Sequence, residues 1–344
     1  MNDELKALIA EIGRQSYDAH VGRHGLPEAF DADLWRVLET SGLTRLTSEQ
    51  GAGPTEAAVV LGELARWAAA VPVAETDVLA TWLAGQADLE VPAEGPLTVA
   101  IADVARRDGL TSTAPYGRIK GSALGVPWPG VGPVVLAARS EESTAVAVLP
   151  PSPVEGTPNL GGEPRGEVTF DLAEDDVVRL PPEVGDELVR RGAWARCVQI
   201  VGAFDAAARL TVEHTGERKQ FGRSLDTFQA VAHSLAALHG EIERSRAATT
   251  LATFAAADHG FDSPEADYAV TVAKVAVGRA VVPVTTIAHQ LHGAIGVTIE
   301  HQLWLATMRA RSWADEFGTT RWHATRLGRM ALAAENPWNV VVGP

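Results

Sequence analysis

Three long runs with helical periodicity occupy most of the second half of the chain and constrain its fold more than any other feature. They cover residues 183–217 and 226–259 and a third run that begins at Ser263 or Asp267 and ends at Leu291. In the middle run the apolar residues are spaced alternately by three and four positions, which places them on one face of a helix. These residues are Phe228, Val231, Leu235, Leu238 and Ile242. Because an isolated helix cannot bury such a stripe, we expect a bundle of long helices here.

The rest of the chain adds two regions of different character. Ala, Leu and Glu dominate residues 1–93, which favours helices. Residues 94–180 instead hold short β-branched segments bounded by Gly or Pro, a pattern typical of a small antiparallel β-domain. We therefore expect a mostly α-helical protein with a small β-domain: an N-terminal helical domain (1–93), a middle β-domain (94–180) and a C-terminal helical bundle (181–344). Shorter helices at 298–311 and 319–332 complete the bundle.

Composition argues against several functional classes. The 344 residues are 46% hydrophobic and 21% charged, as in soluble globular proteins. A net charge of −15 makes nucleic acid an unfavourable partner. No uninterrupted apolar run reaches the roughly 18–20 residues of a membrane span, and the acidic start, Met1–Glu4, lacks the basic region of a signal peptide. The single cysteine, Cys197, lies in an apolar run where we expect it to fill the core of a cytoplasmic protein.

The last long run ends in a glycine-rich turn within His289–Glu300. Two interpretations of Gly293 remain open from the residues. It can be an ordinary helix C-cap, or the helix end and the bare turn amides can hold an anion or the flat edge of a cofactor. His289 and His292 are three residues apart, but no ligand-rich segment accompanies them, so no metal site is expected.

Two blocks resemble the acyl-CoA dehydrogenase family. Residues 290–311, QLHGAIGVTIEHQLWLATMRAR, resemble its Q-x-H-G-G-x-G-[YF]-T-x-E-x-x-L…R signature. Residues 217–238, ERKQFGRSLDTFQAVAHSLAAL, resemble its E-R-x-x-F-G-x-x-[IL]-x-x-F-Q-x-x-x-H-x-L-A block. The resemblance implies the family's fold, with a β-barrel between two helical domains. It also implies FAD-dependent α,β-dehydrogenation of an acyl-CoA thioester, with electrons passed to a separate acceptor.

The same resemblance implies that this chain contacts FAD held mainly by a neighbouring subunit. Arg218 and Phe221 match the family's Arg and Phe at the pyrophosphate and adenine end, and a guanidinium beside an aromatic ring suits these groups. Ala294 replaces the family's second glycine. The flavin contacts expected are Arg218, Gln220, Phe221, Gln290, Gly293 and Thr319. The alternative from the residues alone is a surface Arg and a core Phe.

The position of the family's catalytic base tests whether the chain is active by itself. In most members a Glu directly before Gly-Thr removes the α-proton, but the matching residue here is Phe317. In other members the Glu lies in the first helix of the C-terminal domain, where the matching residue is Gly192. Glu316 is one residue away from the first position, which turns its side chain by about 100° in a helix. We therefore expect no catalytic residue, with Glu316 as the weaker alternative.

The expected β-domain lacks the family's flavin-binding residues. Where the family carries T-E-P-x-x-G-S and W-[IV]-[TS] segments, this chain has IADVARRDGL at 101–110 and GVPWPG at 125–130. Trp128 stands near the expected Trp, but Pro127 and Pro129 flank it and the following Thr is absent. We expect a β-domain that folds without an isoalloxazine ring of its own.

Three functions are compatible with these residues. The favoured one is a subunit of a heteromeric acyl-CoA dehydrogenase, a heterotetramer in which a second dehydrogenase subunit supplies the Glu. His323 and Arg326 resemble a last-helix pattern of actinobacterial members that lack the usual Glu and act on steroid side-chain CoA thioesters. The alternatives are a self-sufficient dehydrogenase whose base is a displaced carboxylate such as Glu316, and a non-enzymatic protein on the same fold.

Overall fold

The computed structural model describes residues 2–20, 25–103, 113–114, 117–152, 156–299 and 301–342. The chain divides into two compact units. The first comprises residues 1–24, 53–69 and 193–344, and the second comprises residues 25–52 and 70–192. The division falls within α5 (Pro182–Glu217).

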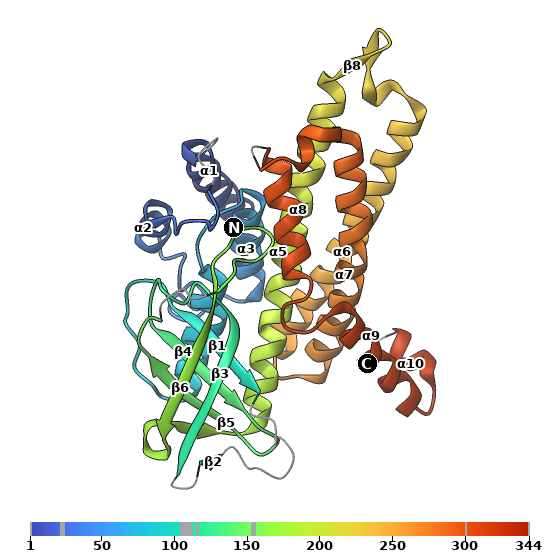
Figure 1. Cartoon of the computed structure of the whole chain (residues 1–344). Coiled ribbons are helices and arrows are strands. Elements are labelled where there is room, and N and C mark those ends of the chain that lie inside the picture. Colours follow the sequence, from blue (N-terminus) through green and yellow to red (C-terminus); the bar gives the residue numbers. More distant parts are fainter. Residues whose placement is uncertain are drawn as a thin grey trace. The chain divides into compact units, whose positions relative to one another are not determined.

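The first unit is the helical bundle expected from the periodic runs (Figure 1). Its helices are α1 (Asn2–His20), α3 (Pro54–Arg66), the larger part of α5, α6 (Gln229–His259), α7 (Pro264–His292), α8 (Gln302–Trp313), α9 (Thr320–Ala333) and α10 (Pro337–Val342). Of the two candidate start residues of α7, Ser263 is the N-cap, because its Oγ accepts a hydrogen bond from Ala266 N at 3.1 Å. The bundle predicted from periodicity is thus confirmed, and α10 is an addition.

The predicted start of α8 at Thr298 is wrong. Residues Gly293–Val297 form a 3-10 segment, and Thr298 Oγ1 donates to Ile295 O at 2.9 Å. Thr298 therefore closes the turn after α7, and α8 begins only at Gln302, where His301 Nδ1 accepts from Leu303 N at 3.2 Å.

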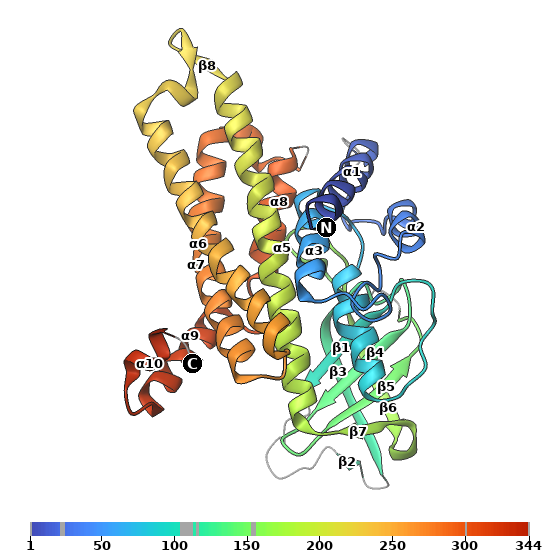
Figure 2. The ribbon, with the colours of Figure 1, turned by 180° about the vertical axis from the view of Figure 1, so that it is seen from behind.

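Close approach of small residues holds this unit together. A Cβ at Gly202 would lie 2.1 Å from Gly62 O, so α3 and α5 are in backbone contact where they cross. Trp194 is fully buried, and its Nε1 donates to Thr253 Oγ1 at 3.0 Å, which joins α5 to α6. α6 and α7 pack along each other (Figure 2).

Together with the turn after it, α7 is long and apolar enough to cross a membrane by length and composition alone. Half of its most apolar window is buried inside the protein. A core helix of a bundle has the same composition, and α7 contacts α6, α8 and α9. The expectation that no segment spans a membrane stays a prediction.

A short hairpin joins α5 to α6. β8 (Lys219–Gln220) pairs with β9 (Arg223–Ser224), and the turn residues Phe221 and Gly222 have φ of 53° and 79°. Positive φ at both central positions is characteristic of a type I′ turn, which suits glycine but strains phenylalanine. Within the first unit, β8 lies beyond the ends of α7 and α8 (Figures 1 and 2).

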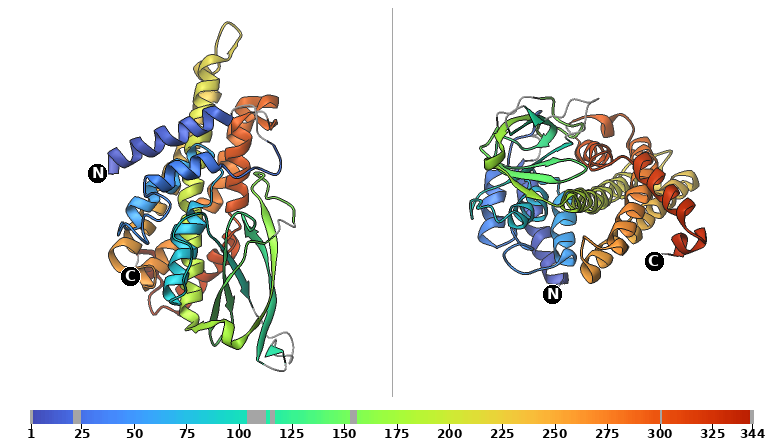
Figure 3. Two further views of the ribbon diagram at one scale, coloured as in Figure 1. Left: turned by 90° about the vertical axis from the view of Figure 1, so that its left-hand side faces the viewer. Right: turned by 90° about the horizontal axis from the view of Figure 1, so that it is seen from below.

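The second unit holds the predicted β-domain. Its helical segments include α2 (Ala32–Thr40), η1 (Ala74–Thr81) and α4 (Trp82–Gln86). One sheet has the order β1 (Thr98–Asp103), β4 (Val134–Arg139), β5 (Thr144–Leu149) and β7 (Val178–Leu180), and the other has the order β2 (Thr113–Ala114), β3 (Arg118–Pro127) and β6 (Arg165–Ala173). The two sheets face each other over a core of mostly small and β-branched side chains (Figure 3).

β1 and β4 are parallel, so the expectation of an antiparallel domain is wrong for this pair of strands. The chain passes through β3 in the other sheet between them, which supplies the crossover that a parallel pair requires.

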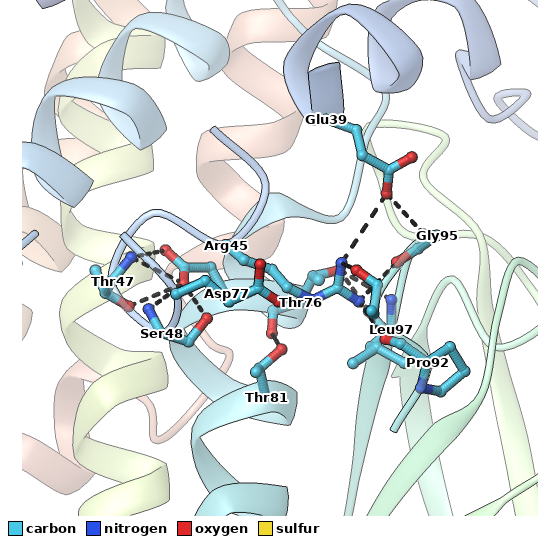
Figure 4. Close-up of polar contacts among 12 residues, drawn as sticks. Glu39, Arg45, Thr47, Ser48, Thr76, Asp77, Thr81, Pro92, Gly95 and Leu97 are labelled. Atoms are coloured by element: carbon cyan, nitrogen blue, oxygen red, sulfur yellow. Dashed lines mark hydrogen bonds and ion pairs between the residues drawn. The ribbon is translucent and has the colours of Figure 1, made fainter. Parts of the chain in front are cut away.

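A buried carboxylate fixes the segment that leads into β1 (Figure 4). Asp77, in the π-helical segment η1, is 2% exposed. It accepts hydrogen bonds from the backbone N–H groups and hydroxyls of Thr47 and Ser48 at 2.9–3.2 Å. Burial raises the pKa of the Asp77 carboxyl, and these donors oppose that shift. Arg45 is likewise buried and donates to three carbonyls of the loop 92–95.

Candidate functional site

The hairpin carries the predicted flavin contacts Arg218, Gln220 and Phe221, and all three are exposed. Phe221 is 92% exposed and meets Phe228 edge-on, with 6.3 Å between ring centroids. The alternative of a core Phe is therefore wrong. Within the described part of the chain, no hydrogen bond or ion pair occupies the Arg218 guanidinium. An exposed aromatic ring and a free guanidinium on a strained turn are typical of a binding surface.

The turn after α7 carries the predicted contacts Gln290 and Gly293. Gly293 ends α7 with φ 68°, and its N–H donates to His289 O, so the C-cap interpretation is confirmed. A Cβ added at Gly293 would meet no atom within 4 Å, so the turn requires glycine for its backbone angle and not for space. Gln290 is exposed on the last turn of α7. An open turn beside an exposed amide side chain leaves room for a flavin edge, and this contact stays a prediction.

Two histidines bring the hairpin helix and the turn together. The rings of His214 and His292 stack with centroids 4.5 Å apart and an interplanar angle of 19°. His214 lies one helical turn before Arg218 on α5, and His292 directly precedes Gly293. Two blocks that are far apart in the sequence are therefore neighbours in the first unit. Thr319, by contrast, caps α9, and among the described residues no contact joins it to the hairpin or the turn.

Phe317 stands at the expected position of the base, in the loop between α8 and α9. Its φ is 53°, which is a strained backbone conformation for phenylalanine. The next residue, Gly318, has φ 98°, which glycine adopts readily. Lys274 Nζ, buried in α7, donates to Ala314 O at 2.9 Å and to Glu316 O at 2.7 Å. Burial lowers the pKa of Lys274, because the ammonium is removed from water. The two hydrogen bonds from Lys274 therefore hold the backbone of this loop in its strained conformation.

Glu316, the alternative base, is paired with a buried guanidinium. Arg196 Nε donates to Glu316 Oε2 at 2.6 Å, and Arg196 is 2% exposed. The guanidinium carbon lies 5.9 Å from the Trp313 ring centroid and 5.7 Å from that of Phe317. A charge-assisted hydrogen bond of this kind fixes the carboxylate toward the bundle core. Gly192, the second expected base position, is buried in α5 and has no side chain to offer.

Two residues that hold the loop between α8 and α9 were not predicted from the sequence: Arg196 and Lys274. Each is a cation inside an otherwise apolar helical run, and buried cations are almost always paired. That pattern was a usable signal for a buried polar contact. It could not identify the partner, because Glu316 lies 120 positions after Arg196.

Trp128 presents no exposed face for a flavin ring. It is 2% exposed with φ 52°. Its backbone N–H donates to Pro164 O at 3.2 Å, and Phe30 packs edge-on against its ring with 6.5 Å between the ring centroids. Most of the other expected flavin segment, IADVARRDGL, lies outside the described residues.

Cys197 is fully buried, as expected. Burial raises the pKa of its thiol to about 12, so the thiol stays protonated at neutral pH. In the ranges that the structure describes, no group of three or more His, Cys, Asp or Glu side chains is placed to hold a metal ion. The candidate functional features are thus the hairpin, the turn after α7, and the loop between α8 and α9 that contains Phe317, which we call the base loop.

Sequence comparison finds relatives over nearly the whole chain. The family model described as "acyl-CoA dehydrogenase, C-terminal domain" matches residues 187–332. Acyl-CoA dehydrogenase IpdE2 of Mycolicibacterium smegmatis is 28% identical over 335 residues, which cover 92% of this chain and 97% of the relative. Acyl-CoA dehydrogenase FadE27 of Mycobacterium tuberculosis is 27% identical, with coverage of 88% and 89%.

Solved structures share the fold. The ChsE4–ChsE5 complex from Mycobacterium tuberculosis superposes with a TM-score of 0.83 at 21% identity, covering 97% of both chains. The steroid ACAD Tcur3481–Tcur3483 gives 0.79 at 24% identity, covering 96% of this chain and 99% of the other. Butyryl-CoA dehydrogenase from Megasphaera elsdenii gives 0.80 at 18% identity, with 96% and 98% covered. All three have a helical domain, a β-domain and a helical bundle in the same order as this chain.

Proposed function

This chain belongs to the acyl-CoA dehydrogenase family, and we propose that within it the chain acts as the non-catalytic subunit of a heteromeric enzyme. It completes the FAD site of a partner subunit, which supplies the carboxylate base and an intact flavin-binding β-domain. When bound, FAD would supply the acceptor for the hydride from the β-carbon of the acyl-CoA thioester, and a separate acceptor would take the electrons onward.

The base loop carries this proposal. Phe317 occupies the expected base position and cannot accept a proton. Glu316 is held in an ion pair with Arg196 at 2.6 Å, and Lys274 donates hydrogen bonds to the backbone of the loop. A general base must reach the proton that it removes within hydrogen-bond distance. A carboxylate held in an ion pair by a buried guanidinium is not free to meet that requirement.

The hairpin and the turn fit a role toward FAD in a partner. Arg218 offers a planar guanidinium that can bond two phosphate oxygens at once. The exposed ring of Phe221 offers an apolar face to a flat base. Gln290 adds an exposed amide, and the turn at Gly293 leaves its outer side open. None of these groups is engaged by the described part of this chain in a way that would block such contacts.

The β-domain of this chain does not fit the isoalloxazine ring. Trp128, which resembles the family's ring-packing Trp, is covered by Phe30 and by the loop at Pro164. The two flanking prolines supply no N–H groups, and the hydroxyl expected after Trp128 is absent. We therefore place the ring in the partner, whose β-domain would provide these donors.

The relatives suggest the kind of assembly and substrate. ChsE4–ChsE5 is a complex of two different chains, and Tcur3481–Tcur3483 is a steroid ACAD. We propose a heterotetramer in the cytoplasm that acts on a CoA thioester, with a steroid side-chain thioester as the substrate class. The electron acceptor is a separate protein.

Flavin stoichiometry tests the proposal. The chain would be expressed alone and together with the dehydrogenase subunit encoded by a neighbouring gene, and FAD would be measured per chain after gel filtration. We expect a colourless chain by itself and a yellow complex on co-expression. A yellow, active chain without a partner would refute the proposal in favour of a self-sufficient enzyme. A complex that forms without flavin would favour the non-enzymatic alternative.

A further inference from the structure

Three histidines form a layer at the end of the bundle, beside the turn after α7. His292 stacks on His214 at 4.5 Å between centroids and meets His301 edge-on at 5.0 Å and 69°. His292 lies one helical turn after Ala288, which belongs to an apolar cluster of buried residues. Its members are Ala207, Ala288 and Leu303, with Leu210 packed against them. His292 therefore adjoins buried apolar side chains and is itself buried.

Hydrogen bonds fix which nitrogen of His292 carries its proton. His292 Nδ1 lies 2.8 Å from Ala288 O and must donate to that carbonyl. Nε2 is then the unprotonated nitrogen. It is buried and has no hydrogen-bond partner in the described part of the chain, and the whole residue is 6% exposed. The neutral form of His292 is built into the closed structure, and its basic nitrogen is buried without a hydrogen-bond partner among the described residues.

The same ring supports the turn that follows it. A Cβ added at Gly296 would lie 2.7 Å from His292 Cβ and 3.1 Å from Leu303 Cδ2, so the turn backbone rests directly on these side chains. His301, the third member of the cluster, caps α8 on the far side of the turn. Any change that pushes the histidine layer apart therefore acts on both ends of Gly293–Val297.

We propose that His292 is a positioning residue for the turn Gly293–Val297, and that proton uptake by the histidine cluster releases this turn. The role of the turn toward flavin rests on the proposed function, whereas the release itself is a property of this chain alone. The consequence is a flavin contact that is formed at neutral pH and given up in acid.

The surroundings of His292 oppose a second proton. The groups that face the cluster from its neighbouring elements are His214, His289, His301 and Arg311. Burial lowers the pKa of His292 to about 4; the hydrogen bond to Ala288 O opposes this shift, and the nearby histidines add to it. Burial also lowers the pKa of His289 and His301. Within the described residues no carboxylate offsets these effects, and Glu300 lies outside the described residues.

The sign and size of the response follow from linkage. His292 has a pKa of about 4 while the turn is closed and the ordinary value of 6.5 once the turn is released. Release therefore takes up one proton between these two values. The closed turn is fully favoured above pH 6.5, and the equilibrium for release rises about tenfold for each pH unit below it. Because protonation is only partial near each of the two pKa values, one histidine contributes about forty-fold between pH 6.5 and 4.5.

Hydrogen exchange on the full-length chain tests this directly. Protection of peptides that cover the turn 293–297 would be measured between pH 7.5 and 4.5 and corrected for the intrinsic chemical rate. We expect protection of the turn to fall about forty-fold between pH 6.5 and 4.5, while peptides from α5 keep theirs. His292→Gln should lose most of this response. His323→Gln is the matched control, because His323 is also buried with a pKa lowered to about 4 but lies in α9.

Three results would overturn the proposal: pH-independent protection of the turn, an equal response in His292→Gln, or a lost response in His323→Gln. If His292→Gln does not fold, the side-chain titration of wild-type His292 decides instead, since a midpoint near 6.5 would mean that the ring does not oppose protonation. A proton-sensitive turn in a chain that never supports flavin binding would refute the proposed function and leave the release intact.

Discussion

Replacing Glu316 with glutamine distinguishes a structural carboxylate from a catalytic one. Glu316 Oε2 accepts from Arg196 Nε at 2.6 Å, and the two side chains are 24% and 2% exposed. Glutamine keeps an oxygen acceptor in place but removes the charge. A hydrogen bond to a charged partner contributes about 1.5–3 kcal/mol and a neutral one roughly 1 kcal/mol. We therefore expect Glu316→Gln to lower the free energy of unfolding by about 1–2 kcal/mol.

Two further variants calibrate that value. Glu316→Ala leaves the buried Arg196 without its carboxylate, and breaking a buried pair in this way costs about 3–5 kcal/mol. The partial exposure of Glu316 places the expected loss at the lower end of that range. Arg196→Met combined with Glu316→Gln removes the buried charge altogether and should recover part of the loss. Urea unfolding followed by tryptophan fluorescence gives these values, with an unchanged m-value as the check on two-state behaviour.

Turnover of the assembled enzyme is the second measurement on the same variants. Glu316→Gln should leave turnover within a few-fold of wild type, because the base belongs to the partner. A loss of more than about a hundredfold, the scale of a missing general base, would make Glu316 catalytic and refute the reasoning. Unchanged stability in both Glu316→Gln and Glu316→Ala would show that the ion pair contributes nothing in solution.

Three more predictions concern other parts of the chain. Arg218→Ala should weaken FAD binding in the heteromer by roughly ten- to a hundredfold without reducing assembly, since one charge-assisted hydrogen bond to the pyrophosphate is lost; Arg218→Lys should recover only part, and unchanged FAD content would sink the idea. The pKa of His323 is lowered from 6.5 to about 4, so the native state binds fewer protons than the unfolded state and stability falls as pH drops from 6.5 toward 4. His323→Gln should flatten that fall by an amount on the order of 3 kcal/mol, and an unaltered stability–pH curve would contradict it. Cys197 should remain unreactive toward a thiol reagent until the protein unfolds, because its thiol is buried with a pKa of about 12; fast labelling of the native chain would show that α5 opens locally.

Local sequence patterns were sufficient to predict much of the fold. The alternating spacing along 226–259 predicted α6, since a helix aligns residues three and four apart whatever lies around it. Ser263, one of two candidate start residues, and Gly293 cap the two ends of α7, and such caps can be predicted because they use groups within a few residues of the helix end. The two family blocks identified the hairpin and the turn as candidate flavin contacts.

Contacts between distant segments could not be predicted in this way. Periodicity showed that residues near Thr298 could be helical, but the packing of Gly296 onto His292 made the segment a turn. The sequence showed that the family's base position holds Phe317 and not Glu. The pairing of Glu316 with Arg196, in contrast, depends on how α5 lies against the loop before α9. The stack of His214 on His292 likewise exists only because α5 and α7 end side by side. Local hydrogen bonding is specified by neighbouring residues, but the partner of a buried charge is specified by the geometry with which whole helices pack.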